Sequence, residues 1–148
     1  MRRAVSILAV VLSACAGGPP KPAALDAGNE WCAWCRMAIS ERRLASQLVA
    51  PGEEPRFFDD LGCLGSYVKG RTLPPATVAY VADHRTREWV SAAAAVYTRV
   101  KNLETPMSSH LLAHADERSR DQDADAAGGV AVSPSEIFGA AGAPGGSR

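Results

Sequence analysis

The chain has 148 residues, and its 16 Lys and Arg residues balance 16 Asp and Glu residues, so the formal net charge at pH 7 is zero. This balance, without any basic patch carrying interleaved aromatic residues, argues against a nucleic-acid partner. The sequence also has no phosphate-binding loop, no nucleophile elbow and no H-E-x-x-H motif, so we expect a protein that is not an enzyme.

The first 14 residues have the pattern of an export signal. Two arginines precede an apolar stretch that is too short for a stable transmembrane span. The stretch ends in Leu12-Ser13-Ala14-Cys15, which resembles the lipobox of bacterial lipoproteins, where cleavage leaves an acylated cysteine. We expect Cys15 to be lipidated and to anchor the protein on the periplasmic side of the envelope. Because Ala16 follows rather than Asp, we expect the outer membrane. An ordinary secretory leader is the alternative.

Composition divides the rest of the chain into three parts. Residues 15–29 are rich in Gly, Pro and Ala, which predicts a flexible linker behind the lipid anchor. Residues 30–138 number about a hundred, enough for one small domain with one core. Residues 139–148 are mainly Gly, Ala and Pro, which predicts a disordered tail.

Short elements follow one another within the predicted domain. A helix is expected from Leu61 to Lys69, because Asp59 or Asp60 can cap its start and Gly70 can end it. One turn of helix is expected at 92–95 and helical structure within the polar segment 110–126. An extended segment at 36–39 precedes strands expected at 47–50, 56–58, 77–82, 87–90, 96–100 and 130–132. Short strands alternating with short helices indicate an α+β fold in a small single domain.

A Cys-x-x-Cys motif, Cys32 to Cys35, stands two residues before Met37. In an extended segment Cys35 and Met37 would point to the same face, and thiolate plus thioether is the ligand pair that selects Cu(I). The two cysteines could equally form a disulfide, a redox couple or part of another metal site. Haem attachment is not indicated, because Arg36 stands where a histidine would be needed.

A third cysteine, Cys63, falls in the first turn of the expected helix, where the helix dipole favours a thiolate. It could bind a metal, pair with Cys32, or serve as a small buried apolar residue. If Cys15 is acylated, three thiols remain. The odd number means that at least one of them is free or metal-bound in a monomer.

Met107 follows Pro106 in a predicted turn, and His110 comes three residues later. If the chain is helical from Ser108, His110 and His114 share a helix face, and imidazole is a second plausible copper ligand. His84, at the end of an expected strand, could reach the same site. The alternative for each histidine is a side chain that faces solvent.

The ordered combination of these residues resembles the NosL family, copper-binding lipoproteins accessory to nitrous oxide reductase. The resemblance covers most of 31–138 and depends on four pieces: Cys32-x-x-Cys35-x-Met37, Phe58-Asp59-Asp60-Leu61-Gly62-Cys63, Trp89 with Tyr97, and Thr105-Pro106-Met107. Two departures are plain. Arg36 stands where members of the family usually have glycine, and glycine is also usual after the Thr-Pro-Met, where this chain has Ser108, Ser109 and His110.

The resemblance implies a fold of two ββαβ units. It also implies Cu(I) held by a cysteine and methionines, and delivery of the copper to an apo copper enzyme through an ABC-type membrane complex. The ligands expected from it are Cys35, Met37 and Met107. Cys32, Cys63 and Asp60 are possible members or neighbours of the site, and His110 could add a ligand.

We therefore expect an exported, lipid-anchored Cu(I) metallochaperone that serves nitrous oxide reductase maturation. The alternative is a periplasmic thiol–disulfide protein that uses Cys32 and Cys35. A third possibility is a binding module in which the same two cysteines form only a structural disulfide.

Overall fold

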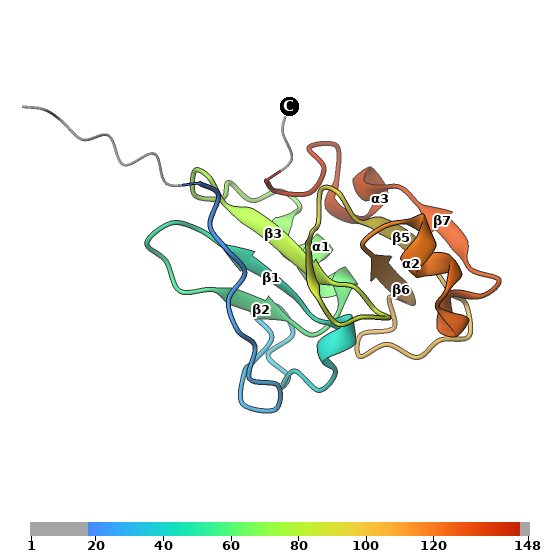
Figure 1. Ribbon diagram of the computed structural model, residues 1–148. Coiled ribbons are helices and arrows are strands. Elements are labelled where there is room, and N and C mark those ends of the chain that lie inside the picture. The colour runs from blue at the N-terminus through green and yellow to red at the C-terminus, as the bar shows by residue number, and fades with distance from the viewer. Residues whose placement is uncertain (1–17, 146–148) are drawn as a thin grey trace, which may run out of the picture.

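The computed structural model describes residues 18–145, so the expected leader and the lipidation site at Cys15 lie outside the described residues. Two antiparallel sheets and three short α-helices make up this part of the chain (Figure 1). The expected α+β class is therefore confirmed. Between residues 18 and 145, no helix combines the length and the apolar character needed to cross a membrane.

The first sheet has four strands in the order β2-β1-β3-β4, and every neighbouring pair is antiparallel. In chain order, helix α1 (Leu61–Val68) connects strand β2 to strand β3. The register places Gln47 opposite Phe57 on one side and Tyr80 on the other. The strands are β1 (Ser46–Val49), β2 (Arg56–Phe58), β3 (Val78–Ala82) and β4 (Trp89–Ser91).

The second sheet repeats this arrangement with three strands in the order β6-β5-β7. Helix α2 (Glu117–Asp121) and the 3-10 turn η2 (Ala124–Ala126) connect its second strand to its third. In each sheet the first strand of the unit lies in the middle, so the chain forms two ββαβ units, as expected. The strands are β5 (Val96–Arg99), β6 (Leu111–His114) and β7 (Val130–Val132).

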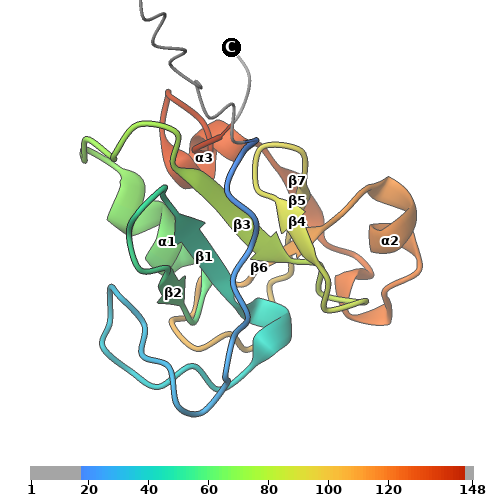
Figure 2. The ribbon, with the colours of Figure 1, turned by 60° about the vertical axis from the view of Figure 1, so that its left-hand side comes forward.

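Helix α1 joins the two units into one domain. It packs against β1 and β2 of its own unit, and against β6 and α3 (Pro134–Phe138) of the other unit. Figure 2 shows α1 behind the first sheet, and α3 packs against α1. The approach to α3 is close at Gly65, where a Cβ atom would clash with the carbonyl oxygen of Ile137. The predicted Asp60 cap is confirmed, because the carboxylate accepts from the backbone N–H of Gly62 at 2.6 Å.

The expectation of a helix through 110–126 is wrong for its first part. Residues Leu111–His114 form strand β6 and pair with β5, and α-helix is confined to Glu117–Asp121. All four residues of β6 are buried. Burial against the neighbouring strand outweighs the local preference of leucine and alanine for helix.

The described parts of the expected linker and tail are ordered against the first sheet, so both expectations are wrong there. Gln47 accepts from the backbone N–H of Ala23 at 2.8 Å and donates to its carbonyl at 3.1 Å. At the other end, Ala143 is buried, and Ala79 donates its N–H to the carbonyl of Pro144 at 3.0 Å. Small residues allow both segments to lie flat on the strands, where side-chain and backbone partners satisfy their polar groups.

Candidate metal centre

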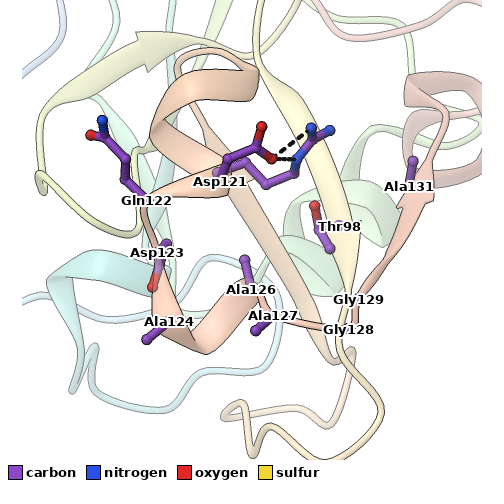
Figure 3. A pocket seen from close by; sticks show the side chains of 11 residues that line it. Thr98, Asp121, Gln122, Asp123, Ala124, Ala126, Ala127, Gly128, Gly129 and Ala131 are labelled. Atoms are coloured by element: carbon purple, nitrogen blue, oxygen red, sulfur yellow. Dashed lines mark hydrogen bonds and ion pairs between the residues drawn. The ribbon is translucent and has the colours of Figure 1, made fainter.

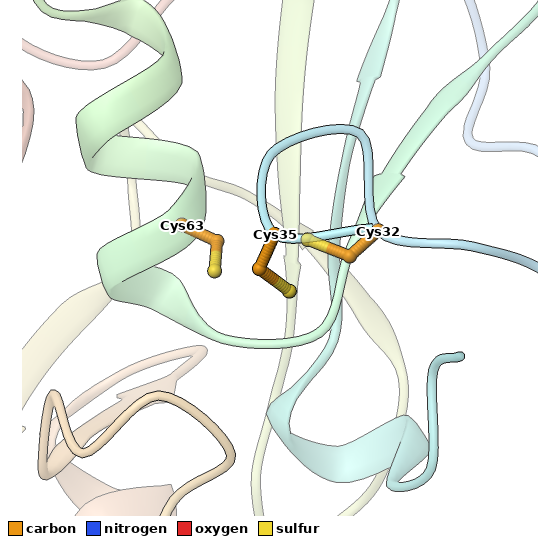
Figure 4. A group of neighbouring side chains, drawn as sticks. All are labelled: Cys32, Cys35 and Cys63. Carbon is orange, nitrogen blue, oxygen red and sulfur yellow. The ribbon is translucent and has the colours of Figure 1, made fainter. Parts of the chain in front are cut away.

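Three cysteines meet between a loop and the start of α1. Cys32 and Cys35 come from the loop at residues 31–38, and Cys63 comes from the first turn of α1 (Figure 4). Their sulfur atoms lie within 4.8 Å of one another. Cys32 and Cys63 are buried and Cys35 is half-buried, and all three are free thiols. A small movement of the side chains would let the three sulfurs bind one metal ion.

A tight turn brings Cys35 back beside Cys32. Cys32 donates its N–H to the carbonyl of Met37 at 2.8 Å and accepts from the N–H of Arg36 at 3.0 Å. Arg36 has a φ of 66°, in the left-handed region. The expectation of an extended segment from residue 36 is therefore wrong at this residue. The alternation that would have placed Cys35 and Met37 on one face is interrupted between them.

A backbone hydrogen bond holds this loop against strand β2, which leads into α1. Ala33 donates its N–H to the carbonyl of Phe57 at 2.8 Å, and Phe58 is fully buried in the same core cluster as Cys32 and Cys63. The segment from Phe57 to Cys63 therefore supplies both the support for the loop and the third thiol.

The three thiols share their protons unequally. The hydrogen bond from Cys63 lowers the pKa of Cys32 to about 4, against the effect of burial, with further help from backbone N–H groups. The same hydrogen bond, together with burial, raises the pKa of Cys63. Burial and the neighbouring Cys32 charge raise the pKa of Cys35. These pKa directions favour the thiolate on Cys32 rather than on Cys63, where the helix dipole was expected to favour it.

A buried carboxyl group lies behind this thiolate. Asp59 Oδ1 accepts from the N–H of Ser40 at 3.1 Å, whereas Asp59 Oδ2 has no hydrogen-bond partner among the described residues. Burial raises the pKa of Asp59, and the negative charges of Cys32 and Asp60 add to the effect. The charged form of Asp59 is therefore disfavoured next to the three cysteines.

Asp60 connects the start of α1 to the loop that carries Met107. Its Oδ1 accepts from Gly62, as the helix cap, and its Oδ2 accepts from the N–H of Met107 at 3.1 Å. Gly62 also lies against Ser109, and a Cβ atom at Gly62 would be 2.9 Å from the Ser109 Cβ. Because backbone N–H groups occupy both oxygens, Asp60 positions the Met107 loop beside the turn that holds Cys63.

The two predicted methionine ligands are half exposed around this site. Met37 is 46% exposed and Met107 is 45% exposed. Trp31 and Trp34, on the same loop as Cys32, are also exposed large apolar side chains. Three of these exposed side chains thus belong to the loop of Cys32 and Cys35, and Met107 belongs to the loop that Asp60 holds at the start of α1.

The expectation that His110 and His114 share a helix face is wrong, because Leu111–His114 form strand β6. His110 Nδ1 lies 2.6 Å from the carbonyl oxygen of Leu103, in a loop where His110 has a φ of 58°. His114 ends strand β6, and His84 follows β3. Both rings meet Asp123, which sequence reasoning missed, and these three residues form a second group that could hold a metal ion. Burial raises the pKa of Asp123, but hydrogen bonds from His114 and His84 outweigh burial and lower it.

Comparison with known proteins adds no relative. No protein-family model matches the chain, and no curated protein or solved structure matches it. The structure itself shows a small α+β domain in which Cys32, Cys35 and Cys63 lie close enough to bind a metal ion.

Proposed function

We propose that the protein is an exported, lipid-anchored Cu(I) carrier of the NosL type. It would receive copper at Cys32, Cys35 and Cys63 and pass it to an apo copper enzyme. By resemblance this enzyme is nitrous oxide reductase, reached through an ABC-type membrane complex. The observation that carries the proposal is the meeting of three free thiols within 4.8 Å of one another, where hydrogen bonding lowers the pKa of Cys32.

The ligand chemistry supports copper in its reduced state. Thiolate and thioether sulfur are soft ligands and select Cu(I), whereas structural zinc sites close four ligands in a tetrahedron. Three cysteines are one ligand short of a closed structural zinc site, although they could hold zinc more weakly with a water molecule as the fourth ligand. For Cu(I) they are sufficient, and Met37 or Met107 can add a weaker sulfur. We propose the cysteines as the principal ligands and the two methionines as the supplementary ones.

The backbone conformation supports the resemblance at the two positions where the sequence departs from it. Arg36 has a φ of 66° and Ser108 has a φ of 55°, both in the left-handed region that glycine adopts without steric cost. Members of the NosL family usually have glycine at the position of Arg36 and after the Thr-Pro-Met, in the stretch that begins with Ser108 here. The loops therefore keep the turn that a glycine would favour, although the residue has changed.

The surroundings of the cysteines suit transfer rather than storage. Cys35 is half-buried, so an incoming sulfur or imidazole ligand can approach the metal at this cysteine. The exposed side chains of Trp31, Trp34, Met37 and Met107 give a partner an apolar surface around the point of transfer. Ligand exchange across such a surface needs no large movement of either protein.

Thiol–disulfide exchange is the second candidate function, and the low pKa of Cys32 favours it. A redox cysteine of this kind must also be reached by the partner's sulfur. Cys32 is 0% exposed, whereas the more accessible Cys35 has a raised pKa. The thiolate is thus on the cysteine that a substrate disulfide cannot reach, which favours metal binding.

The test is an anaerobic titration of the reduced protein with Cu(I) in competition with a chromophoric Cu(I) chelator. We expect one tightly bound Cu(I) per chain. Cys63→Ser should weaken Cu(I) binding by more than about tenfold. An effect of about tenfold is usual for residues that only support a metal ligand, and the loss of a ligand should exceed it. Met37→Leu and Met107→Leu should weaken it less.

His110→Gln serves as the matched control and should bind like the wild type, because the His110 ring is directed at the Leu103 carbonyl. Failure of the wild type to compete with the chelator would contradict the proposal. So would a Cys63→Ser variant that binds Cu(I) as tightly as the wild type.

A further inference from the structure

We infer that His84, His114 and Asp123 form a second metal site, which takes a divalent ion of borderline softness such as Zn(II). This site uses other residues and another ligand chemistry than the three cysteines. The inference therefore stands whether or not the proposed copper function is correct.

The three side chains converge on one point. Asp123 Oδ2 lies 2.6 Å from His84 Nδ1 and 2.9 Å from His114 Nε2. The three ligand atoms lie within 4.8 Å of one another. The side chains are 3%, 0% and 8% exposed for His84, His114 and Asp123, so the group is shielded from water. Opening both contacts to about 3.3 Å, the separation of neighbouring ligands in a tetrahedral zinc site, would make room for a bound ion.

Each ligand comes from a different segment that the fold holds in place. His84 follows β3 and donates its N–H to the carbonyl of Ala113 at 2.9 Å, and His114 is the last residue of β6. Asp123 caps η2 by accepting from the N–H of Asp125 at 3.0 Å. The geometry is thus set by the backbone of both units. A bound ion would join the first unit to the second.

A buried carboxylate fixes the two histidine segments from behind. Asp83 Oδ1 accepts from the N–H groups of Arg85 and Thr86, and Asp83 Oδ2 accepts from the N–H of Ala115. The residues next to His84 and His114 are therefore tied to the same side chain. Together, Asp83 and Asp123 place two buried acids beside two imidazoles, which favours a cation in this region.

Hydrogen bonding alone leaves this group incomplete. One oxygen of Asp123 serves both rings, while His114 Nδ1 is buried without a partner among the described residues. Thr98 Oγ1, on the same face of the second sheet as His114, is likewise buried and unpaired. An ion held by His114 Nε2 would not contact Nδ1 on the other side of the ring, so these unpaired atoms point to a water molecule beside the site.

The ligand set indicates which ion. Two imidazoles and one carboxylate bind zinc and other borderline divalent metals, whereas calcium and magnesium take oxygen ligands and Cu(I) takes sulfur. Asp123 and Thr98 also line an open cavity of about 790 Å³ with Ala126 and Gly129 (Figure 3). This cavity gives an ion a route to Asp123 and room for a water molecule as a further ligand.

The test is a Zn(II) titration of the reduced, ¹⁵N-labelled protein, followed by long-range ¹H–¹⁵N spectra of the imidazole rings. These spectra resolve each histidine, so zinc bound at the cysteines does not interfere. We expect the ring nitrogens of His84 and His114 to shift with the first equivalents of zinc. Those of His110, the matched control within the same chain, should not shift. The melting temperature should rise with zinc, because the ion joins both units.

Asp123→Asn and His84→Gln provide two independent variants. Each should weaken the zinc response of the remaining rings by at least about tenfold, and the response of the cysteines should persist. Unchanged His84 and His114 rings in the wild-type protein under excess zinc would overturn the inference. So would a response that both variants retain at wild-type affinity. Neither result depends on whether the cysteines bind Cu(I).

Discussion

Replacement of Cys63 by alanine tests the electrostatics of the three-cysteine group. In the native protein the Cys63 thiol donates to Cys32 and is the largest cause of its low pKa, about 4. The remaining backbone N–H groups act against burial, which raises the pKa. Without the thiol donor, we expect the pKa of Cys32 to return to the ordinary range of about 8.5 or above.

The size of this effect follows from the two pKa values. Near pH 6 a cysteine with a pKa of about 4 is ~99% thiolate, whereas one with a pKa of about 8.5 is only ~0.3% thiolate. The wild-type domain should therefore carry one thiolate per chain at this pH, and the Cys63→Ala variant should carry none.

The assay is the ultraviolet absorbance of the thiolate, followed through a pH titration of the domain from residue 18 onward. Cys63→Ser is the matched control, because the hydroxyl can still donate to Cys32 and should keep its pKa low. The reasoning would be refuted by a Cys63→Ala variant that keeps its thiolate near pH 6. A wild-type domain that has none would refute it as well.

Three further substitutions test the local structure by chemical unfolding. Asp59→Asn should stabilise the protein by about 1 kcal/mol at neutral pH. Because the pKa of Asp59 is raised in the folded state, the protonated side chain contributes stability below the unfolded-state pKa, and this stability is lost as the pH rises through the folded-state pKa. The gain from Asp59→Asn should therefore vanish in acid. Arg36→Gly should stabilise the protein by about 0.5–1 kcal/mol, because glycine removes the strain of the left-handed conformation but adds entropy to the unfolded chain. Arg36→Ala keeps the strain and should not stabilise the protein. Gly65→Ala should destabilise by about 1–3 kcal/mol through contact with Ile137, whereas Ser66→Ala, on the exposed face of the helix, should have little effect.

Local signals in the sequence were sufficient for the elements with strong boundaries. The Asp60 cap and Gly70 marked both ends of α1 within a residue. The two aspartates after Phe58 and the two glycines before Val130 bounded β2 and β7. Strand β6 was missed because Leu111 to His114 has no alternation, although a predicted turn precedes it. Its conformation comes from pairing with β5, a contact that is not local.

The same distinction holds for the sites. Spacing singled out Cys32 and Cys35, and the helix cap placed Cys63 on the first turn of α1, so their meeting was one of the predicted alternatives. The role of the two methionines as ligands stays a prediction. The group at Asp123 could not be foreseen, because Asp123 lies 39 residues after His84 and no motif connects them.

The most direct test of the copper proposal is the X-ray absorption spectrum of the protein loaded with one equivalent of Cu(I). The proposed site predicts a first shell of two or three sulfur atoms at about 2.3 Å, with none of the shorter distances of about 2.0 Å that nitrogen ligands give. A first shell dominated by nitrogen or oxygen would contradict it, because copper would then be bound away from Cys32, Cys35 and Cys63.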